Sequence, residues 1–474
     1  MSYYLLLPEI IVTLAAFGIL VIGALLPEDR QRALGYLAIL GLIISLLSTL
    51  ALSGVKQTAF SGMFILDPFS LFFKRVFLTV TFLIILTSIN YAKKQFLLLG
   101  VGEYYFIILL ATVGMMFLAS AGELVTLFIS IELLSVSSYI LAAYLREKKS
   151  AEAGLKYLLY GIPASAVLLY GLSIIFSLTG HTDFATIGNA VNQHGMEPFL
   201  IIGLVLVIGG LCFKAAVAPF HMWAPDVYEG APTPITAFLA AGSKAAALAV
   251  IMRIFMVVFI PVKTGWIAFF IVLSILSMGL GNLAAIPQTN IKRLLAYSSI
   301  GHVGYILIGL ICATKMAVSS ILFYIVAYAL AIISAFTVVV IVSSKVGSDE
   351  IKDYNGLSKR SPFLALVLLV SLISLAGIPP MAGFVGKFYL FAAAIEHNLL
   401  WLVLIAITCS VISIYYYFQI VKSMYLFDPE DDSRIPVPAS LFLMLSAITV
   451  SLFLIGIFPN PFIKAATSAI LDLF

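Results

Sequence analysis

Four charged residues lie near the middle of long apolar stretches, where a membrane-spanning helix would bury them: Glu132, Lys214, Lys244 and Lys387. A charge at the bilayer centre costs at least about 2.5–3.5 kcal/mol on insertion scales, so we expect each of the four to have a use or a partner. A lysine in apolar surroundings releases its proton more readily than one in water, and a nearby carboxylate opposes that release. These residue types therefore indicate proton transfer. We expect Glu132 to hold Lys214 charged until it moves away, with Lys244 and Lys387 continuing the path in a hydrated cavity.

Two other interpretations stay open. A long side chain can carry its charge to the headgroups, which suits the basic residues nearer the helix ends: Lys74, Arg75, Lys156, Arg253 and Lys422. This fails for Lys244, about eleven residues from either end of its apolar stretch, because the side chain reaches only about 6 Å. Alternatively, Glu132 and one lysine form a fixed structural ion pair, which leaves Lys244 and Lys387 without an acidic partner.

Two histidines lie in the same apolar setting. His221 lies in a proline-containing stretch, and His302 lies beside Gly301 and Gly304. The pKa of free histidine is near neutral, so either side chain could relay protons between the lysines. A hydrogen-bonded packing role is an equal alternative for both.

The composition excludes a soluble protein. Of 474 residues, 62% are hydrophobic and 10% are charged, against about 25% charged in a typical soluble domain. The net charge of +4 is spread along the chain and predicts no nucleic-acid partner. The sequence lacks GxGxxG after a strand, a Walker lysine, CxxC and a histidine pair at haem or zinc spacing. We therefore expect no cofactor or metal on this chain, which would move charge without redox chemistry of its own.

The chain reads as an all-α polytopic membrane protein of about 14 transmembrane helices. We expect helices near 5–26, 33–53, 68–91, 104–120, 122–145, 155–178, 199–229, 233–256, 264–286, 290–313, 316–344, 362–397, 400–426 and 437–458, then a short interfacial helix at the C-terminus. Two of them contain helix breakers and should be interrupted in mid-membrane. The breakers are Pro219 and Pro225 in 199–229, and Gly377, Pro379, Pro380, Gly383 and Gly386 in 362–397.

The two breaks fall at matching places in two five-helix units, which is typical of inverted repeats. We predict four segments: three N-terminal helices (1–103), repeat 1 (104–256), inverted repeat 2 (257–426), and a last helix with a tail (427–474). With the N-terminus outside, fourteen basic loop residues fall on the cytoplasmic side: Arg30, Arg32, Lys93, Lys94, Arg146, Lys148, Lys149, Lys292, Arg293, Lys345, Lys352, Lys359, Arg360 and Arg434. Four fall outside: Lys56, Lys263, Lys315 and Lys464. This asymmetry favours both termini on the outer, periplasmic side.

Three stretches carry a family resemblance: "FKAAVAPFHMWAPDVYEGAPTPITAFLAAGSK", "NIKRLLAYSSIGHVGYILIG" and "LAGIPPMAGFVGKF". The chain resembles the antiporter-like membrane subunits of respiratory complex I (NADH–quinone oxidoreductase), which are shared with Mrp-type sodium/proton antiporters. Among these it is most similar to the N-type subunits. Its length fits them, it lacks the long lateral helix of L-type subunits, and it carries Lys387 where M-type subunits carry glutamate.

The resemblance implies roles residue by residue. Glu132 matches the glutamate of helix five, and Lys214 matches its partner lysine in the first broken helix. Lys244 matches the central lysine of the next helix, and Lys387 the terminal lysine of the second broken helix. Lys156 matches a further lysine that modulates the Glu132–Lys214 pair.

The resemblance also implies a proton-translocating subunit of a bacterial NADH–quinone oxidoreductase in the inner membrane. NADH, flavin, iron–sulfur clusters and quinone would bind to partner subunits, and neighbouring antiporter-like subunits would contact this chain within the lipid bilayer. Alternatives are an Mrp-type cation/proton antiporter subunit, a relative of complex I fed by ferredoxin, deazaflavin or hydrogen, and a purely structural membrane spacer.

Overall fold

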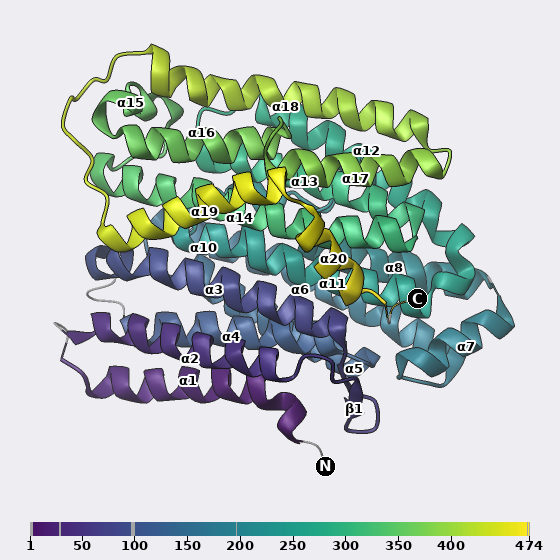
Figure 1. The fold of residues 1–474 in the computed structure, drawn as a ribbon. Coiled ribbons are helices and arrows are strands. Elements are labelled where there is room, and N and C mark those ends of the chain that lie inside the picture. Colours follow the sequence, from purple (N-terminus) through teal and green to yellow (C-terminus); the bar gives the residue numbers. More distant parts are fainter. Residues whose placement is uncertain (1–2, 28–29, 96–99, 196, 472, 474) are drawn as a thin grey trace.

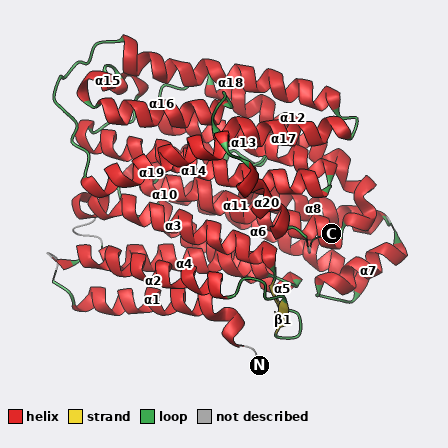
Figure 2. Ribbon diagram, viewed as in Figure 1, coloured by secondary structure: helices red, strands yellow, loops and turns green. Residues whose placement is uncertain are grey.

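The computed structural model describes residues 3–27, 30–95, 100–195, 197–471 and 473, and helices make up almost all of it (Figures 1 and 2). The first half contains α1 Leu7–Leu25, α2 Arg32–Ala51, α3 Pro68–Gln95, α4 Val101–Ser120, α5 Leu124–Ala142, α6 Lys148–Thr179, α7 Phe184–His194, α8 Pro198–Ala215 and α9 Trp223–Gly230. The second half contains α10 Thr233–Phe238, α11 Lys244–Arg253, α12 Lys263–Ala285, α13 Ile291–Cys312, α14 Lys315–Val346, α15 Leu357–Arg360, α16 Pro362–Ala376, α17 Ala382–Glu396, α18 Leu400–Leu426, α19 Ala439–Ile457 and α20 Asn460–Ala469.

Thirteen helices of the described chain are long and apolar enough to cross a membrane. Each matches one of the fourteen predicted helices, and the remaining prediction, 362–397, corresponds to α16 and α17 together. The predicted fold class is therefore confirmed. The side chains of Lys93 and Lys94, two of the basic residues counted for topology, lie outside the described residues.

The first predicted break lies between α8 and α9. α8 ends where Ala216 takes a left-handed conformation (φ 56°), and the amide of Val217 donates to the carbonyl of Cys212 at 2.9 Å. α9 begins at Trp223. Pro225 was wrongly predicted to break the helix. It lies in the first turn of α9, where a residue without an N–H loses no helical hydrogen bond.

The second break, between α16 and α17, has the same local geometry. Gly377 follows α16 with φ 82°, and the amide of Ile378 donates to the carbonyl of Ile373 at 3.2 Å. A left-handed residue after a helix is most often glycine because it has no Cβ to clash. Each break leaves the last carbonyls of its helix without an intrahelical partner.

A short helix between the sixth and seventh spans was not predicted. In α7 the apolar residues Phe184, Ile187 and Val191 are buried, a spacing that places them on one helical face. Asp183 caps the helix, because its carboxylate accepts from the amide of Thr186 at 2.8 Å. Both signals are present in the sequence.

Two further features were not predicted. Strands β1 Gln57–Ala59 and β2 Phe64–Leu66 form an antiparallel hairpin before α3. Two π-helical turns, Leu239–Ser243 and Ile254–Val258, flank α11 on either side.

The most buried helices form the centre of the bundle. The segment Thr233–Val258, which includes α10 and α11, is buried along its whole apolar window, and α13 and α14 are nearly so. Figure 1 shows these helices in the middle of the molecule, with α1 and α2 at one edge and α18 at the other. A polar group on α11 or α13 therefore meets protein on every side.

Candidate functional site

Lys214 lies in the last turn of α8, directly before the first break, and is 2% exposed. Its Nζ donates a hydrogen bond to the hydroxyl of Tyr157 on α6 at 3.2 Å. It also faces the rings of Tyr157 and Tyr139, at 5.3 and 5.7 Å from their centroids. Trp223, the first residue of α9, stacks on Tyr157 with the ring centroids 4.3 Å apart. The second half of the broken helix thus packs on the tyrosine that bonds Lys214, and Lys214 lies where a helix C-terminus favours a cation.

The expected ion pair between Glu132 and Lys214 is not formed in the described structure. Glu132 on α5 accepts a hydrogen bond from Ser165 at 2.5 Å, and its charge acts on Lys214 only from beyond ion-pair distance. Glu132 is half-buried, and it shares its helix face with the exposed residues Ile129 and Val136. Residues three and four apart point the same way on a helix. Sequence alone could not tell that this face points outward from the chain.

Lys244 is the first residue of α11, directly after a π-helical turn, and is 2% exposed. Its Nζ donates to the hydroxyl of Ser299 on α13 at 2.5 Å and lies 5.7 Å from the ring centroid of Tyr228. Ser243, the preceding residue, lies beside the hydroxyl of Tyr157. Tyr157, which bonds Lys214, thus lies beside the residue that precedes Lys244.

His302 lies one helical turn beyond Ser299 on α13 and is 3% exposed. Its Nδ1 is 2.7 Å from the hydroxyl of Tyr324 on α14. Its Nε2 is 3.1 Å from the hydroxyl of Tyr417 on α18, which also makes a short hydrogen bond with Ser298. Both ring nitrogens are therefore occupied, each by a group that can donate or accept a proton.

Lys387 lies on α17, just after the second break, and is 4% exposed. Its Nζ donates to the carbonyls of Leu375 and Ala376 at 3.2 and 2.9 Å, and to the hydroxyl of Ser410 at 2.8 Å. It also lies 4.7 Å from the ring centroid of Tyr305. The break exposes the terminal carbonyls of α16, and Lys387 uses them in place of a carboxylate.

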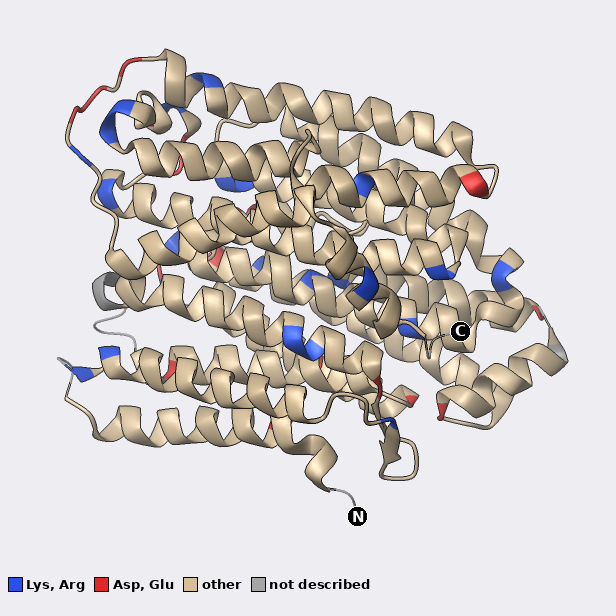
Figure 3. Cartoon of the chain, in the orientation of Figure 1, with Lys and Arg blue, Asp and Glu red and all other residues tan. Residues whose placement is uncertain are grey.

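Hydrogen bonds and ring contacts continue from His302 towards Lys387. The ring of Tyr417 lies 4.5 Å from that of Tyr416, and the hydroxyl of Tyr416 donates to Asn282 at 3.0 Å. The amide of Asn282 donates to the hydroxyl of Tyr305 at 3.2 Å. We call the whole set the buried polar row: Glu132, Ser165, Tyr157, Lys214, Lys244, Ser299, His302, Tyr417, Tyr416, Asn282, Tyr305 and Lys387. Figure 3 shows basic positions in the middle of helices, away from those at the ends.

Several buried polar atoms around Lys244 have no hydrogen-bond partner among the described residues. They are the hydroxyls of Tyr228, Ser243 and Tyr328, and Nδ1 of His221. His221 lies close enough to Lys244 to interact with it electrostatically. Buried hydroxyls without a protein partner are the groups that bind internal water. This region of the row is thus suited to hydration.

Comparisons with known proteins identify the family of the chain. Residues 121–413 match the family described as NADH:quinone oxidoreductase/Mrp antiporter, transmembrane region. A protein of Moorella thermoacetica named NADH-quinone oxidoreductase subunit N is 43% identical over 475 residues, which cover 100% of this chain and 99% of that protein. The chain belongs to this antiporter family. Respiratory complex I from Thermus thermophilus with bound aureothin contains a chain that is 31% identical, with a TM-score of 0.82, covering 97% of this chain and 99% of that one. A chain of the membrane-bound sulfane sulfur reductase, an archaeal respiratory membrane complex, is 27% identical, with a TM-score of 0.89, covering 100% and 98%.

The described residues of this antiporter-family chain form no metal-ligand cluster. Among them, no group of three or more His, Cys, Asp and Glu side chains could hold a metal ion. The three cysteines, Cys212, Cys312 and Cys409, are free and buried.

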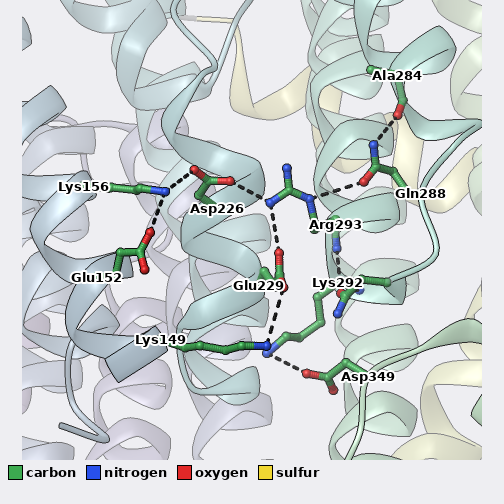
Figure 4. Close-up of polar contacts among 11 residues, drawn as sticks. Lys149, Glu152, Lys156, Asp226, Glu229, Ala284, Gln288, Lys292, Arg293 and Asp349 are labelled. Carbon is green, nitrogen blue, oxygen red and sulfur yellow. Dashed lines mark hydrogen bonds and ion pairs between the residues drawn. The ribbon is translucent and has the colours of Figure 1, made fainter. Parts of the chain in front are cut away.

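Lys156 lies in an ionic network at one end of the bundle (Figure 4). It pairs with Glu152 at 2.9 Å and with Asp226 of α9 at 2.8 Å. Asp226 also pairs with Arg293 of α13 at 2.7 Å, and Arg293 reaches Glu229 at 3.0 Å. The side chain of Lys156 is 39% exposed, so its ammonium group reaches the surface at this end, where carboxylates fix it. The network joins α6, α9 and α13, and Lys156 precedes Tyr157 of the buried polar row.

Two basic residues expected to snorkel, Lys74 and Arg253, are instead buried in ion pairs. Lys74 pairs with Glu9 of α1 at 2.8 Å, and both side chains are at most 1% exposed. Arg253, the last residue of α11, pairs with Asp67 through two nitrogens at 2.9 and 3.0 Å and donates to the carbonyl of Ala119. Neither ion pair was predicted. Glu9 lies in the first turn of α1, and Asp67 lies directly before α3.

Other polar members of the row were also missed or undervalued. Tyr157 and Tyr305 hydrogen-bond to other members of the row. Ser299, Asn282 and Tyr417 were not selected. Their signal in the sequence is weak, because single polar residues in apolar helices are common and their orientation depends on the fold.

Proposed function

We propose that this chain is the proton-translocating membrane subunit of an NADH–quinone oxidoreductase. The observation that carries the proposal is the buried polar row, in which hydroxyl, imidazole and amide side chains lie between the lysines of both broken helices. Relatives named NADH-quinone oxidoreductase subunit N, such as that of Moorella thermoacetica, support this assignment. NADH, flavin, iron–sulfur clusters and quinone would bind to partner subunits, and this chain would carry none of them.

The three lysines of the row have different surroundings, and we assign each a different step of proton transfer. Lys214 exchanges a proton under the influence of Glu132, because a change in the position of that carboxylate changes how firmly the ammonium group holds its proton. Lys244 then receives the proton through the hydrated surroundings of Ser243. His302 and the tyrosines of the row carry it to Lys387, whose charge the carbonyls of α16 stabilise.

Such transfer needs an external source of free energy. Moving one charge against 100 mV takes about 2.3 kcal/mol. Quinone reduction in the partner subunits would supply it and displace Glu132. We further propose that both termini lie on the outer side of a bacterial inner membrane, and that 104–256 and 257–426 are inverted repeats between the N-terminal helices (1–103) and the tail (427–474).

The test is charge removal in the assembled complex. Lys214→Met and Glu132→Ala should each lower NADH-driven proton uptake into proteoliposomes and the coupled quinone reductase rate together. Lys464→Met, at an exposed position on α20, is the matched control and should change neither. Unchanged pumping and reductase rates in both row variants would contradict the roles.

The same proteoliposomes distinguish an NADH-driven proton pump from the main alternative, a cation/proton antiporter. A cation/proton antiporter would exchange protons for sodium in proteoliposomes without NADH. Sodium-dependent exchange that persists in the absence of an electron donor would replace the proposal with that activity. Identifying the electron-input subunits in the native assembly would decide between NADH and another donor.

A further inference from the structure

A cavity of about 640 Å³ lies at one end of the bundle, away from the buried polar row. Its walls are the first turn of α2, the last turns of α3 and α14, and the segment 435–438 before α19. The N-terminal helices meet those of the second half here (Figure 1).

Donors of hydrogen bonds gather at the rim of this cavity. Arg32 and Lys345 are its two charged lining residues among those described, and both are exposed. Arg32 donates to Oδ1 of Asn90 at 3.1 Å, which leaves the amide nitrogen of Asn90 buried without a partner among the described residues. Two exposed cations suit an anionic oxygen group.

No acidic residue is among the described residues that line the cavity. Asp431 lies in the loop before the cavity wall and is not among the lining residues. Hydrogen bonds from Ser433 hold the pKa of Asp431 below its usual range, and the charges of Arg360 and Lys345 add to the effect. Its carboxylate is thus already engaged by Ser433, at 2.8 Å from the amide.

The inner wall of the cavity is apolar. Ile341 of α14 and Ile435 are buried, and Val437 with its flanking prolines completes this side. A free phosphate ion would use the rim and leave these walls in contact with water. A molecule with a charged head and hydrocarbon chains would use both.

The positions of Arg32 and Lys345 along the bundle agree with the binding of a lipid headgroup. Arg32 begins α2 and Lys345 lies in the last turn of α14, so both lie where these spans end and the headgroup layer begins. The same end carries most of the loop lysines and arginines counted in the sequence, as expected for the side that faces anionic lipid headgroups.

We propose that this cavity binds one anionic glycerophospholipid, with its phosphate on Arg32 and Lys345 and an acyl chain along Ile341, Ile435 and Val437. The lipid would join α2 and α3 to α14 and the start of α19. This inference does not depend on proton translocation.

The experiment uses the whole complex, washed in detergent and transferred to nanodiscs of phosphatidylcholine with a small fraction of phosphatidylglycerol. Native mass spectrometry then measures the phosphatidylglycerol retained per complex. Arg32→Gln with Lys345→Gln should lose one retained molecule and weaken binding by roughly 25-fold, or about fivefold for each removed cation. The matched control, Lys148→Gln with Lys352→Gln, removes two exposed charges outside the cavity and should retain the lipid.

A second variant tests the cavity without removing its charges, in case the charge variant prevents assembly of the complex. Val437→Trp fills the cavity and keeps both cations, so it should also lose the lipid. Equal retention in the charge variant and its control would overturn the proposal, as would displacement of the lipid by inorganic phosphate or equal retention of phosphatidylcholine. A crosslink from Val437→Cys to a neighbouring subunit in the intact complex would show that protein fills the cavity, and would also overturn it.

Discussion

Removing the hydroxyl of Tyr417 should interrupt the buried polar row beside His302. This hydroxyl contacts Nε2 of His302 at 3.1 Å and also bonds Ser298, and the side chain is 1% exposed. Tyr417→Phe leaves Nε2 of His302 and the hydroxyl of Ser298 buried without a hydrogen bond, which costs about 1–3 kcal/mol for each unsatisfied group. If one such group opposes proton transfer, the rate falls about 5- to 150-fold, because about 1.4 kcal/mol is tenfold.

The assay is NADH-driven acidification of proteoliposomes that contain the purified complex. Tyr354→Phe is the matched control, since Tyr354 is fully buried and its hydroxyl has no hydrogen-bond partner among the described residues. Complex assembly should be retained in both variants, because one buried hydroxyl is a small fraction of the core. Equal pumping by Tyr417→Phe and Tyr354→Phe would refute the reasoning that protons pass this hydroxyl.

Three further substitutions test other regions of the structure. Gly377→Ala places a Cβ at φ 82° and 2.8 Å from Cδ of Lys387, so pumping should fall at least severalfold while assembly persists; unchanged pumping would show that Lys387 tolerates displacement. Ser410→Ala removes one of the three hydrogen-bond acceptors of Lys387 and should lower pumping less than Lys387→Met does, with equal losses arguing against graded stabilisation. Asp67→Asn leaves Arg253 buried without its carboxylate, so the free energy of unfolding should fall by about 3–5 kcal/mol; an unchanged denaturation midpoint would show that the pair adds no stability.

The sequence was sufficient to predict the membrane-spanning helices and both interruptions, because long apolar runs and Pro/Gly clusters are local signals. It also identified the four central charges, since a charge in an apolar stretch stands out whatever its orientation. The direction in which each side chain points was not predictable. Glu132 is bonded to Ser165 and Lys74 to Glu9, and both pairings depend on helix rotation.

Contacts between residues that are distant in the chain set a second limit on prediction from the sequence. Asp67 and Arg253 are 186 positions apart in the chain, and no local pattern links two such positions. The π-helical turns beside Lys244 are similarly invisible, because they arise when packing shifts the hydrogen-bond register within one continuous helix. Tertiary contacts decide both features.

The half-exposed position of Glu132 has a consequence for handling this protein. Its face of α5 also presents Ile129 and Val136 outward, so in a lone copy placed in a bilayer the carboxylate would look towards acyl chains. Hydrocarbon solvates such a group poorly, whereas a cationic or hydroxyl-bearing surface from an adjoining chain would accept it. A purified single chain should therefore be a poor guide to how Glu132 works, and measurements on it belong with its neighbours present.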